Sequence, residues 1–127
     1  MKKLVVIFCV LAICIMCIPV YGTLSNYSDT IPTFGNKTVA TGSKTNTRTF
    51  YRNLTLDCES AFNGWVEAYL NGKWTQVTDT QKFYANKNVT INYNATPSAG
   101  VQVRFVISKY DGQVFGGQSV TGTVNFE

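Results

Sequence analysis

The alternation of hydrophobic and polar residues is most regular around Asn71-Gly72, a dipeptide that favours a two-residue turn between antiparallel strands. A type I′ turn at this point pairs Tyr69 with Trp74 and extends the hairpin from Trp65 to Val77. Paired residues point to the same side of a sheet, which gives the hairpin an aliphatic side and an aromatic side. The aliphatic side comprises Val66, Ala68, Leu70, Thr75 and Val77, and the aromatic side comprises Trp65, Glu67, Tyr69, Trp74 and Gln76.

Further segments alternate with the period of two that is typical of strands. The predicted strands cover residues 37–42, 47–58, 88–93 and 101–110, with a brief segment at 82–84. In each long strand one set of alternate residues is apolar, and we expect that set to face the core. These apolar sets are Phe50, Leu54, Leu56 and Cys58, then Val89, Ile91 and Tyr93, and finally Val101, Val103, Phe105 and Ile107.

Asp111-Gly112 predicts a second two-residue hairpin turn near the end of the chain. Counting from this turn pairs Val103 with Val120 and places Ile107 opposite Gly116. The apolar faces of the two strands then agree over much of their length, which favours a hairpin between them.

Short strands separated by turn residues, with no helical periodicity after residue 22, predict an all-β protein. About seven strands around one core indicate an antiparallel β-sandwich, for which we expect an immunoglobulin-like arrangement. The cysteine pair of immunoglobulin domains is absent from the sequence, so this expectation concerns architecture only. We predict a single β-sandwich domain over residues 37–127. A flexible N-terminal arm at residues 23–36, with at most one edge strand near residues 31–34, precedes it.

Residues 1–22 have the parts of a secretory signal peptide. Lys2 and Lys3 form a positive start, residues 4–18 are continuously apolar, and residues 20–22 offer small residues before a cleavage site. The apolar run is shorter than the roughly 20 residues that a membrane-spanning helix needs. We therefore predict a secreted, extracellular protein that meets the membrane only during export. A lipid anchor on Cys14 is the alternative, which the bulky Ile13 disfavours.

Removal of this segment changes the composition of the chain. Cys58 becomes the only cysteine, which excludes an intrachain disulfide, and the loss of two lysines lowers the net charge from +4 to +2. A charge this small does not favour nucleic acid as a partner. Stability must then come from the burial of apolar side chains in a domain of about 105 residues.

The sequence contains no histidine, which is the commonest general base and metal ligand. Cys58 has no basic neighbour to activate it, and Asp57 and Glu59 fit a solvated pair better than a catalytic one. No motif points to a cofactor or a metal, so we predict a non-enzymatic protein. Five Asn-x-Ser/Thr motifs, at Asn26, Asn36, Asn53, Asn88 and Asn94, would be glycan acceptors in a eukaryotic secretory pathway.

The aromatic side of the hairpin is the candidate binding surface. Tyr110 and Phe115 join it if the two predicted hairpins share a sheet, and Arg104 then projects to the same side. The predicted ligand-binding residues are Trp65, Tyr69, Trp74, Arg104, Tyr110 and Phe115. Flat rings beside hydrogen-bonding side chains suit sugars, and Trp, Tyr and Arg are also enriched in protein interfaces. In the opposite orientation the tryptophans belong to the core, which would bury Glu67 and Gln76.

These features predict a secreted binding module whose ligand is a glycan of an envelope or matrix, or a surface protein. Two other classes stay open. One is a small secreted antagonist, such as a bacteriocin-like toxin. The other is a structural protein of a matrix or cell surface that assembles through a β edge or an apolar patch.

Overall fold

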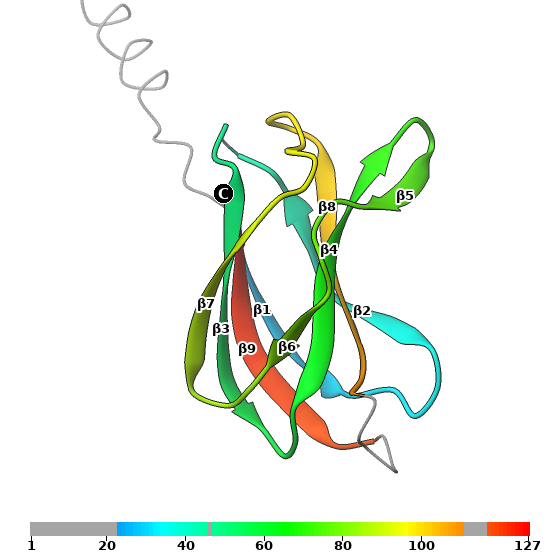
Figure 1. Cartoon of the computed structure of the whole chain (residues 1–127), viewed down its shortest axis with the longest axis vertical. Helices are drawn as coiled ribbons and strands as arrows, with labels where there is room; N and C mark the ends of the chain where they lie inside the picture. The colour runs from blue at the N-terminus through cyan, green and yellow to red at the C-terminus, as the bar shows by residue number, and fades with distance from the viewer. Residues whose placement is uncertain (1–22, 46, 111–116) are drawn as a thin grey trace, which may run out of the picture.

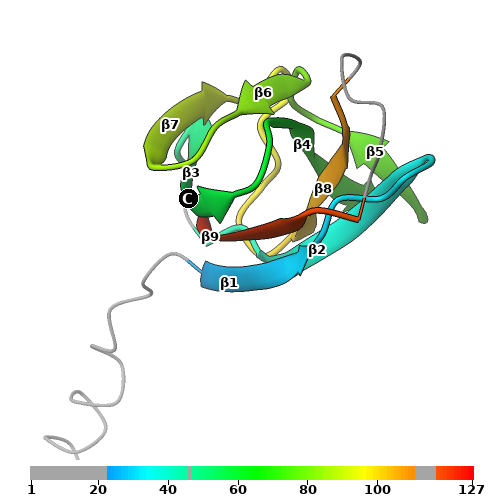
Figure 2. The same ribbon diagram turned by 90° about the horizontal axis from the view of Figure 1, so that it is seen from below.

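The chain forms two antiparallel β-sheets that pack face to face, as Figures 1 and 2 show from two directions. This computed structural model describes residues 23–45, 47–110 and 117–127, which form nine strands and no helix. The predicted all-β antiparallel sandwich is confirmed, with more strands than the roughly seven that the sequence indicated.

Each sheet combines strands that are distant in the sequence. Sheet A contains, in spatial order, β1 (Thr23–Thr30), β9 (Ser119–Phe126), β3 (Phe50–Cys58) and β7 (Lys87–Asn92). Sheet B contains β2 (Asn36–Ser43), β8 (Gln102–Lys109), β4 (Phe62–Leu70) and β5 (Lys73–Gln76). The short strand β6 (Gln81–Phe83) also pairs with β4 in sheet B.

The strand pairs are nested, as in a long hairpin that has been folded over on itself. The innermost pair is β4 with β5, followed outward by β3 with β7, β2 with β8 and β1 with β9. Pairing of β9 with β3 and of β8 with β4 then joins these pairs into the two sheets. This order is that of a double-sheet jelly roll.

The last two strands do not form the predicted hairpin. β8 lies in sheet B between β2 and β4, whereas β9 lies in sheet A between β1 and β3. The predicted pairing of Val103 with Val120 is wrong, because Val103 pairs with Gly42 and Ala68. The immunoglobulin-like arrangement, in which the last two strands share a sheet, is therefore not found. By separating, each of the two strands gains hydrogen-bonded neighbours on both sides. The Asp111-Gly112 turn itself, with Gly116, lies outside the described residues.

The sequence pattern predicted that the side of β3 with Phe50, Leu54 and Leu56 faces the core, and this prediction is also wrong. Tyr51, Asn53 and Thr55 are buried between the sheets, whereas Leu56 is 50% exposed. The side-chain oxygen of buried Asn53 accepts hydrogen bonds from the hydroxyls of Tyr27 and Thr55, both at 3.1 Å, whereas its amide nitrogen has no hydrogen-bond partner among the described residues. A β-bulge between Thr55 and Asp57 then reverses the alternation, so that Cys58 again faces inward, opposite Val120.

The segment predicted as a flexible arm is part of the sandwich. Residues 23–30 form β1, which pairs with β9 along its whole length, and Tyr27 and Ile31 are buried in the core. The expected edge strand at residues 31–34 is absent from the described structure, and Phe34 is 87% exposed. Residues 1–22 lie outside the described residues, so the signal peptide stays a prediction.

The centre of the core is aromatic. The Phe105 ring lies 5.5 Å from that of Phe83, 5.6 Å from that of Tyr27 and 6.3 Å from that of Tyr51. Close packing of these rings leaves little room for additional atoms beside them, since a Cβ on Gly64 would come within 2.7 Å of the Phe105 ring. Because this close packing holds the strands of sheet B in place, the side chains on its outer face also have defined positions.

Candidate functional site

The predicted hairpin is present as β4 and β5 with the expected register. Tyr69 pairs with Trp74 and Leu70 with Lys73. Asn71 and Gly72 have φ values of 52° and 80°, the positive values that a type I′ turn requires at both central positions. The turn therefore fixes which side chains of the hairpin face the core and which face outward.

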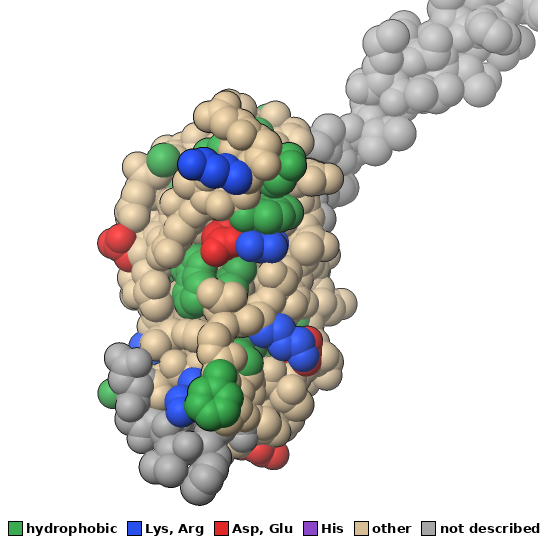
Figure 3. Space-filling model, turned by 90° about the vertical axis from the view of Figure 1, so that its right-hand side faces the viewer, with side chains coloured by type: hydrophobic (Ala, Val, Ile, Leu, Met, Phe, Trp, Pro, Cys, Tyr) green, Lys and Arg blue, Asp and Glu red, His purple; other side chains and the backbone are tan. Residues whose placement is uncertain are grey.

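The aliphatic side of the hairpin faces the core and the aromatic side lies on the outer face of sheet B. Val66, Ala68 and Val77 are fully buried in the core cluster. On the outer face Tyr69 is 46% exposed and Trp74 is half-buried, whereas Trp65 is only 9% exposed. Figure 3 views this side of the molecule and shows an acidic and a basic side chain in contact, with hydrophobic side chains above and below them.

Glu67 and Arg104 are the charged pair at the centre of this face. They are directly opposite each other on β4 and β8. The Arg104 Nε atom donates a hydrogen bond of 2.7 Å to Oε2 of Glu67, and a second guanidinium nitrogen lies 2.6 Å from the same oxygen. The other carboxylate oxygen, Oε1, accepts a 3.0 Å hydrogen bond from the indole nitrogen of Trp65. Both oxygens of Glu67 are thus engaged within the protein.

Trp74 extends from β5 across the face toward β8. Its ring packs edge-on against Tyr69, with 5.3 Å between the centroids, and the Arg104 guanidinium lies 4.4 Å from the indole ring. The indole also borders a hollow of about 360 Å³ over the ends of β2 and β8. The described residues around this hollow are Thr41, Gly42, Ser43, Trp74, Gln102 and Val103. An aromatic wall and short polar side chains therefore meet in one concave site, whose volume falls within the range of small-molecule pockets.

Tyr110 does not belong to this site. It follows the end of β8 beyond Lys109, which pairs with Phe62, and is about 20 Å along the strand from Arg104. There the Lys82 ammonium lies 3.2 Å from the centroid of the Tyr110 ring and 5.3 Å from that of Tyr84. The neighbouring Tyr110 hydroxyl raises the pKa of Lys82. Phe115 lies outside the described residues, so its predicted place in the site is not tested.

Sequence reasoning missed the residues that β2 contributes. Thr41 pairs with Arg104, and Ser43 pairs with Gln102, only because β2 lies beside β8. Along the sequence, β2 and β8 are separated by more than half of the described residues, and no local pattern indicates that they are neighbours in the sheet. Gln102 could have been found, because it alternates with the inward-facing Val101 and Val103 on the strand that was predicted.

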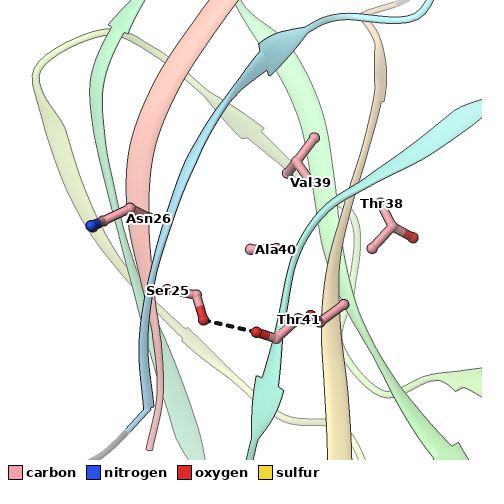
Figure 4. Close-up of a pocket in the computed structure, with 6 residues that line it drawn as sticks. All are labelled: Ser25, Asn26, Thr38, Val39, Ala40 and Thr41. Carbon is pink, nitrogen blue, oxygen red and sulfur yellow. Dashed lines mark hydrogen bonds between the residues drawn. The ribbon is translucent and has the colours of Figure 1, made fainter.

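Two other hollows have no aromatic side chain among the described residues that line them. One, of about 450 Å³, lies where the edge strands β1 and β2 meet, and Figure 4 shows the hydrogen bond across it from the Ser25 hydroxyl to the Thr41 carbonyl, 2.9 Å long. The described residues around it are Ser25, Asn26, Thr38, Val39, Ala40 and Thr41. The other, of about 260 Å³, lies on the outer face of sheet A beside Leu24 and Arg52. The described residues of these two linings offer no ring on which a planar or cyclic ligand could stack.

The remaining candidate residues do not converge. Cys58 is half-buried, and burial raises the pKa of its thiol, which disfavours the reactive thiolate. Asp57 and Glu59 are both exposed, and Glu59 accepts a 3.3 Å hydrogen bond from the backbone nitrogen of Ser119. Among the described residues, no group of three or more His, Cys, Asp or Glu side chains is placed to hold a metal ion. The described part of the chain also has no helix of the length and hydrophobicity needed to cross a membrane.

Comparison of the chain with protein-family models, with curated proteins and with solved structures gives no match. The geometry of the site is therefore the basis on which a function can be inferred.

Proposed function

We propose that this protein is a secreted, non-enzymatic glycan-binding module, and that a sugar ring stacks on Trp74 in the hollow above β2 and β8. The observation that carries the proposal is the partly exposed indole of Trp74 beside a concave surface of polar side chains. Export is inferred from residues 1–22. An extracellular glycan of an envelope or matrix is the class of ligand that such a protein meets.

The chemistry of the hollow suits a sugar. A pyranose ring has apolar C–H faces that pack on an aromatic ring and hydroxyls around its rim that need hydrogen-bond partners. Trp74 offers the ring, and Thr41, Ser43 and Gln102 offer two hydroxyls and an amide at the margin of the same hollow. An amide and a hydroxyl both donate and accept, so they can match sugar hydroxyls in either sense.

The contacts of Trp74 within the protein hold it ready for such a ligand. Tyr69 packs against one edge of the indole and Arg104 lies over its ring system. A side chain that is already ordered loses little further rotamer freedom on binding, which leaves more of the stacking energy for affinity. Trp74 is therefore better suited to bind a ligand than Tyr84, an exposed aromatic residue at the far end of the same face.

The proposal is tested by gel electrophoresis of the protein through matrices that contain soluble polysaccharides of different backbones. We expect at least one polysaccharide to retard the native protein and the Trp74→Ala variant to run as in its absence. Phe34→Ala is the matched control, because Phe34 is an exposed aromatic residue in the loop between β1 and β2, away from the hollow. Equal retardation of all three proteins, or retardation of none, would refute binding at Trp74.

A further inference from the structure

The charged groups of the site are directed toward each other and not toward the hollow. Arg104 donates to Glu67 through two nitrogens, and its guanidinium also lies against the indole of Trp74. Glu67 is held from its other side by the Trp65 indole. Their side chains are only 28% and 15% exposed. The pair therefore presents little net charge to a molecule in the hollow.

The lining of the hollow is itself uncharged. The described residues that form it are hydroxyl, amide, aromatic, aliphatic and glycine residues, and none of them is ionisable in the physiological range. Lys73 lies next to Trp74 in sequence, but it pairs with Leu70 and so belongs to the opposite side of the hairpin. No side chain in the described lining is thus available to neutralise an ionic group of a ligand.

An ionic ligand would also meet unfavourable neighbours. A carboxylate or sulfate that took the two guanidinium nitrogens now bonded to Glu67 would leave a partly buried carboxylate without its cation. A cationic amino sugar would approach the guanidinium of Arg104 before it reached the acid. Both cases carry a desolvation or repulsion cost that an uncharged sugar does not.

We propose that the ligand of this site is an uncharged glycan, with no carboxylate, sulfate or free amine on the sugar that stacks on Trp74. This inference rests on the proposed function and specifies its ligand class. In it Glu67 and Arg104 are positioning residues: they neutralise each other and hold the indole, and they do not bind the ligand directly. Affinity is then governed by stacking and neutral hydrogen bonds, which salt screens very little.

The test compares neutral polysaccharides (glucans, galactans, mannans and xylans) with acidic ones (polygalacturonate, alginate and hyaluronan) on the native protein. For a neutral polysaccharide we expect Kd to change by less than about twofold when ionic strength is raised about tenfold, and we expect acidic ones to bind at least about tenfold more weakly. If only acidic polysaccharides bind, and their binding is salt-sensitive, the proposal of an uncharged ligand is refuted. The proposed function as a glycan-binding module would still stand. Failure of both groups to bind would overturn the proposed function as well.

A second measurement examines the role of the charged pair. Glu67→Gln keeps the shape of the side chain and leaves the Arg104 cation unneutralised. At low salt we therefore expect acidic polysaccharides to bind the variant with an affinity about tenfold higher than they bind the native protein. A purely structural role for Glu67 predicts no such gain. A cooperative urea unfolding transition verifies that the variant is folded. If this folded variant still rejects acidic polysaccharides, pairing with Glu67 is not what excludes them, and the inference fails.

Discussion

Trp65 and Trp74 lie on the same face of sheet B but in different surroundings. Trp65 is covered almost completely, and its indole nitrogen has a defined partner in Glu67. Trp74 contacts Tyr69 and Arg104 and keeps part of its surface toward solvent. Trp65 therefore serves mainly the stability of this face, whereas Trp74 is the indole that a ligand can reach.

The two tryptophans should differ in what their removal costs. Trp65→Ala deletes a nearly buried indole and a hydrogen bond to Glu67, so we expect a loss of about 3–5 kcal/mol in the free energy of unfolding. Trp74→Ala removes one aromatic pair and one cation–π contact, worth about 1–2 kcal/mol beyond the area that the indole buries, and its total loss should stay below that of Trp65→Ala because Trp74 is less buried. Urea denaturation of the two variants measures both values. Equal losses would contradict the difference in burial.

The sequence predicted the orientation of these tryptophans but not their burial. The Asn71-Gly72 turn is a local signal, and it fixed the register and therefore the side on which Trp65 and Trp74 lie. The cover over Trp65 depends instead on β8, where Val106 lies opposite Trp65 and Arg104 lies opposite Glu67. That neighbour is set by long-range strand pairing, which leaves no trace in the hairpin's own sequence.

At the scale of single elements, β3 shows why alternation alone misassigned a face. Its residues alternate regularly enough to predict a strand, and leucines at positions 54 and 56 favoured their side for the core. The opposite side carries Asn53 and Thr55, which are buried because they bond each other and Tyr27. The bulge between Thr55 and Asp57 is defined only by the pairing with β9. Neither feature is visible in the strand by itself.

Because the polar side of β3 faces the core, we expect removal of a polar side chain there to cost more stability than removal of a leucine. Asn53→Ala removes the acceptor shared by the Tyr27 and Thr55 hydroxyls and leaves both buried without it, so we expect a loss of about 2–4 kcal/mol. Leu56→Ala, at a side chain that is 50% exposed, should cost about 1 kcal/mol or less. Chemical denaturation of both variants provides the comparison. A larger loss for Leu56→Ala would restore the face that the sequence pattern favoured.

At the scale of the whole molecule, most strands were predictable, with β1 as the exception, whereas the pairing of β4 with β5 was the one strand partnership that the sequence predicted correctly among the described residues. Periodicity identifies a strand because it depends on the residues of that strand alone. The nested order of the jelly roll depends on pairs such as β1 with β9 and β2 with β8, which join the two ends of the chain. A local hairpin between β8 and β9 would satisfy the apolar faces of those two strands, but it would leave β1 and β2 without their partners. The complete set of pairs decides the topology.

The folded molecule also holds several ionisable groups away from water. Burial raises the pKa of Tyr27, Tyr51 and Tyr93 above the ordinary tyrosine value. The Lys44 side chain is buried as well, where its ammonium donates to the backbone carbonyls of Arg48, at 2.6 Å, and Glu127, at 2.5 Å. Burial lowers the pKa of Lys44, against the opposing effect of Glu127. The tyrosines and the lysine thus affect alkaline stability in opposite directions.

Above about pH 10 the unfolded chain releases its tyrosine protons while the native state retains those of the three buried tyrosines, so stability should fall as pH rises. A tyrosine whose proton the native state fully retains contributes a loss of roughly 1.4 kcal/mol per pH unit over this range. Lys44 acts in the reverse sense, because its native form binds fewer protons than the unfolded form, and its contribution rises with pH up to its ordinary value of about 10.4. Three groups outweigh one, and a net loss of stability remains.

Tyr93→Phe isolates one of these contributions. The Tyr93 hydroxyl is buried and finds no hydrogen-bond partner among the described residues, so its removal should cost almost nothing at neutral pH. Above about pH 10 the variant should lose stability less steeply than the native protein, by roughly 1.4 kcal/mol per pH unit. Urea unfolding at a series of pH values measures both slopes, with tyrosinate absorbance as a second reading. Parallel curves above that pH would show that Tyr93 already ionises in the folded protein, in conflict with its burial between the sheets.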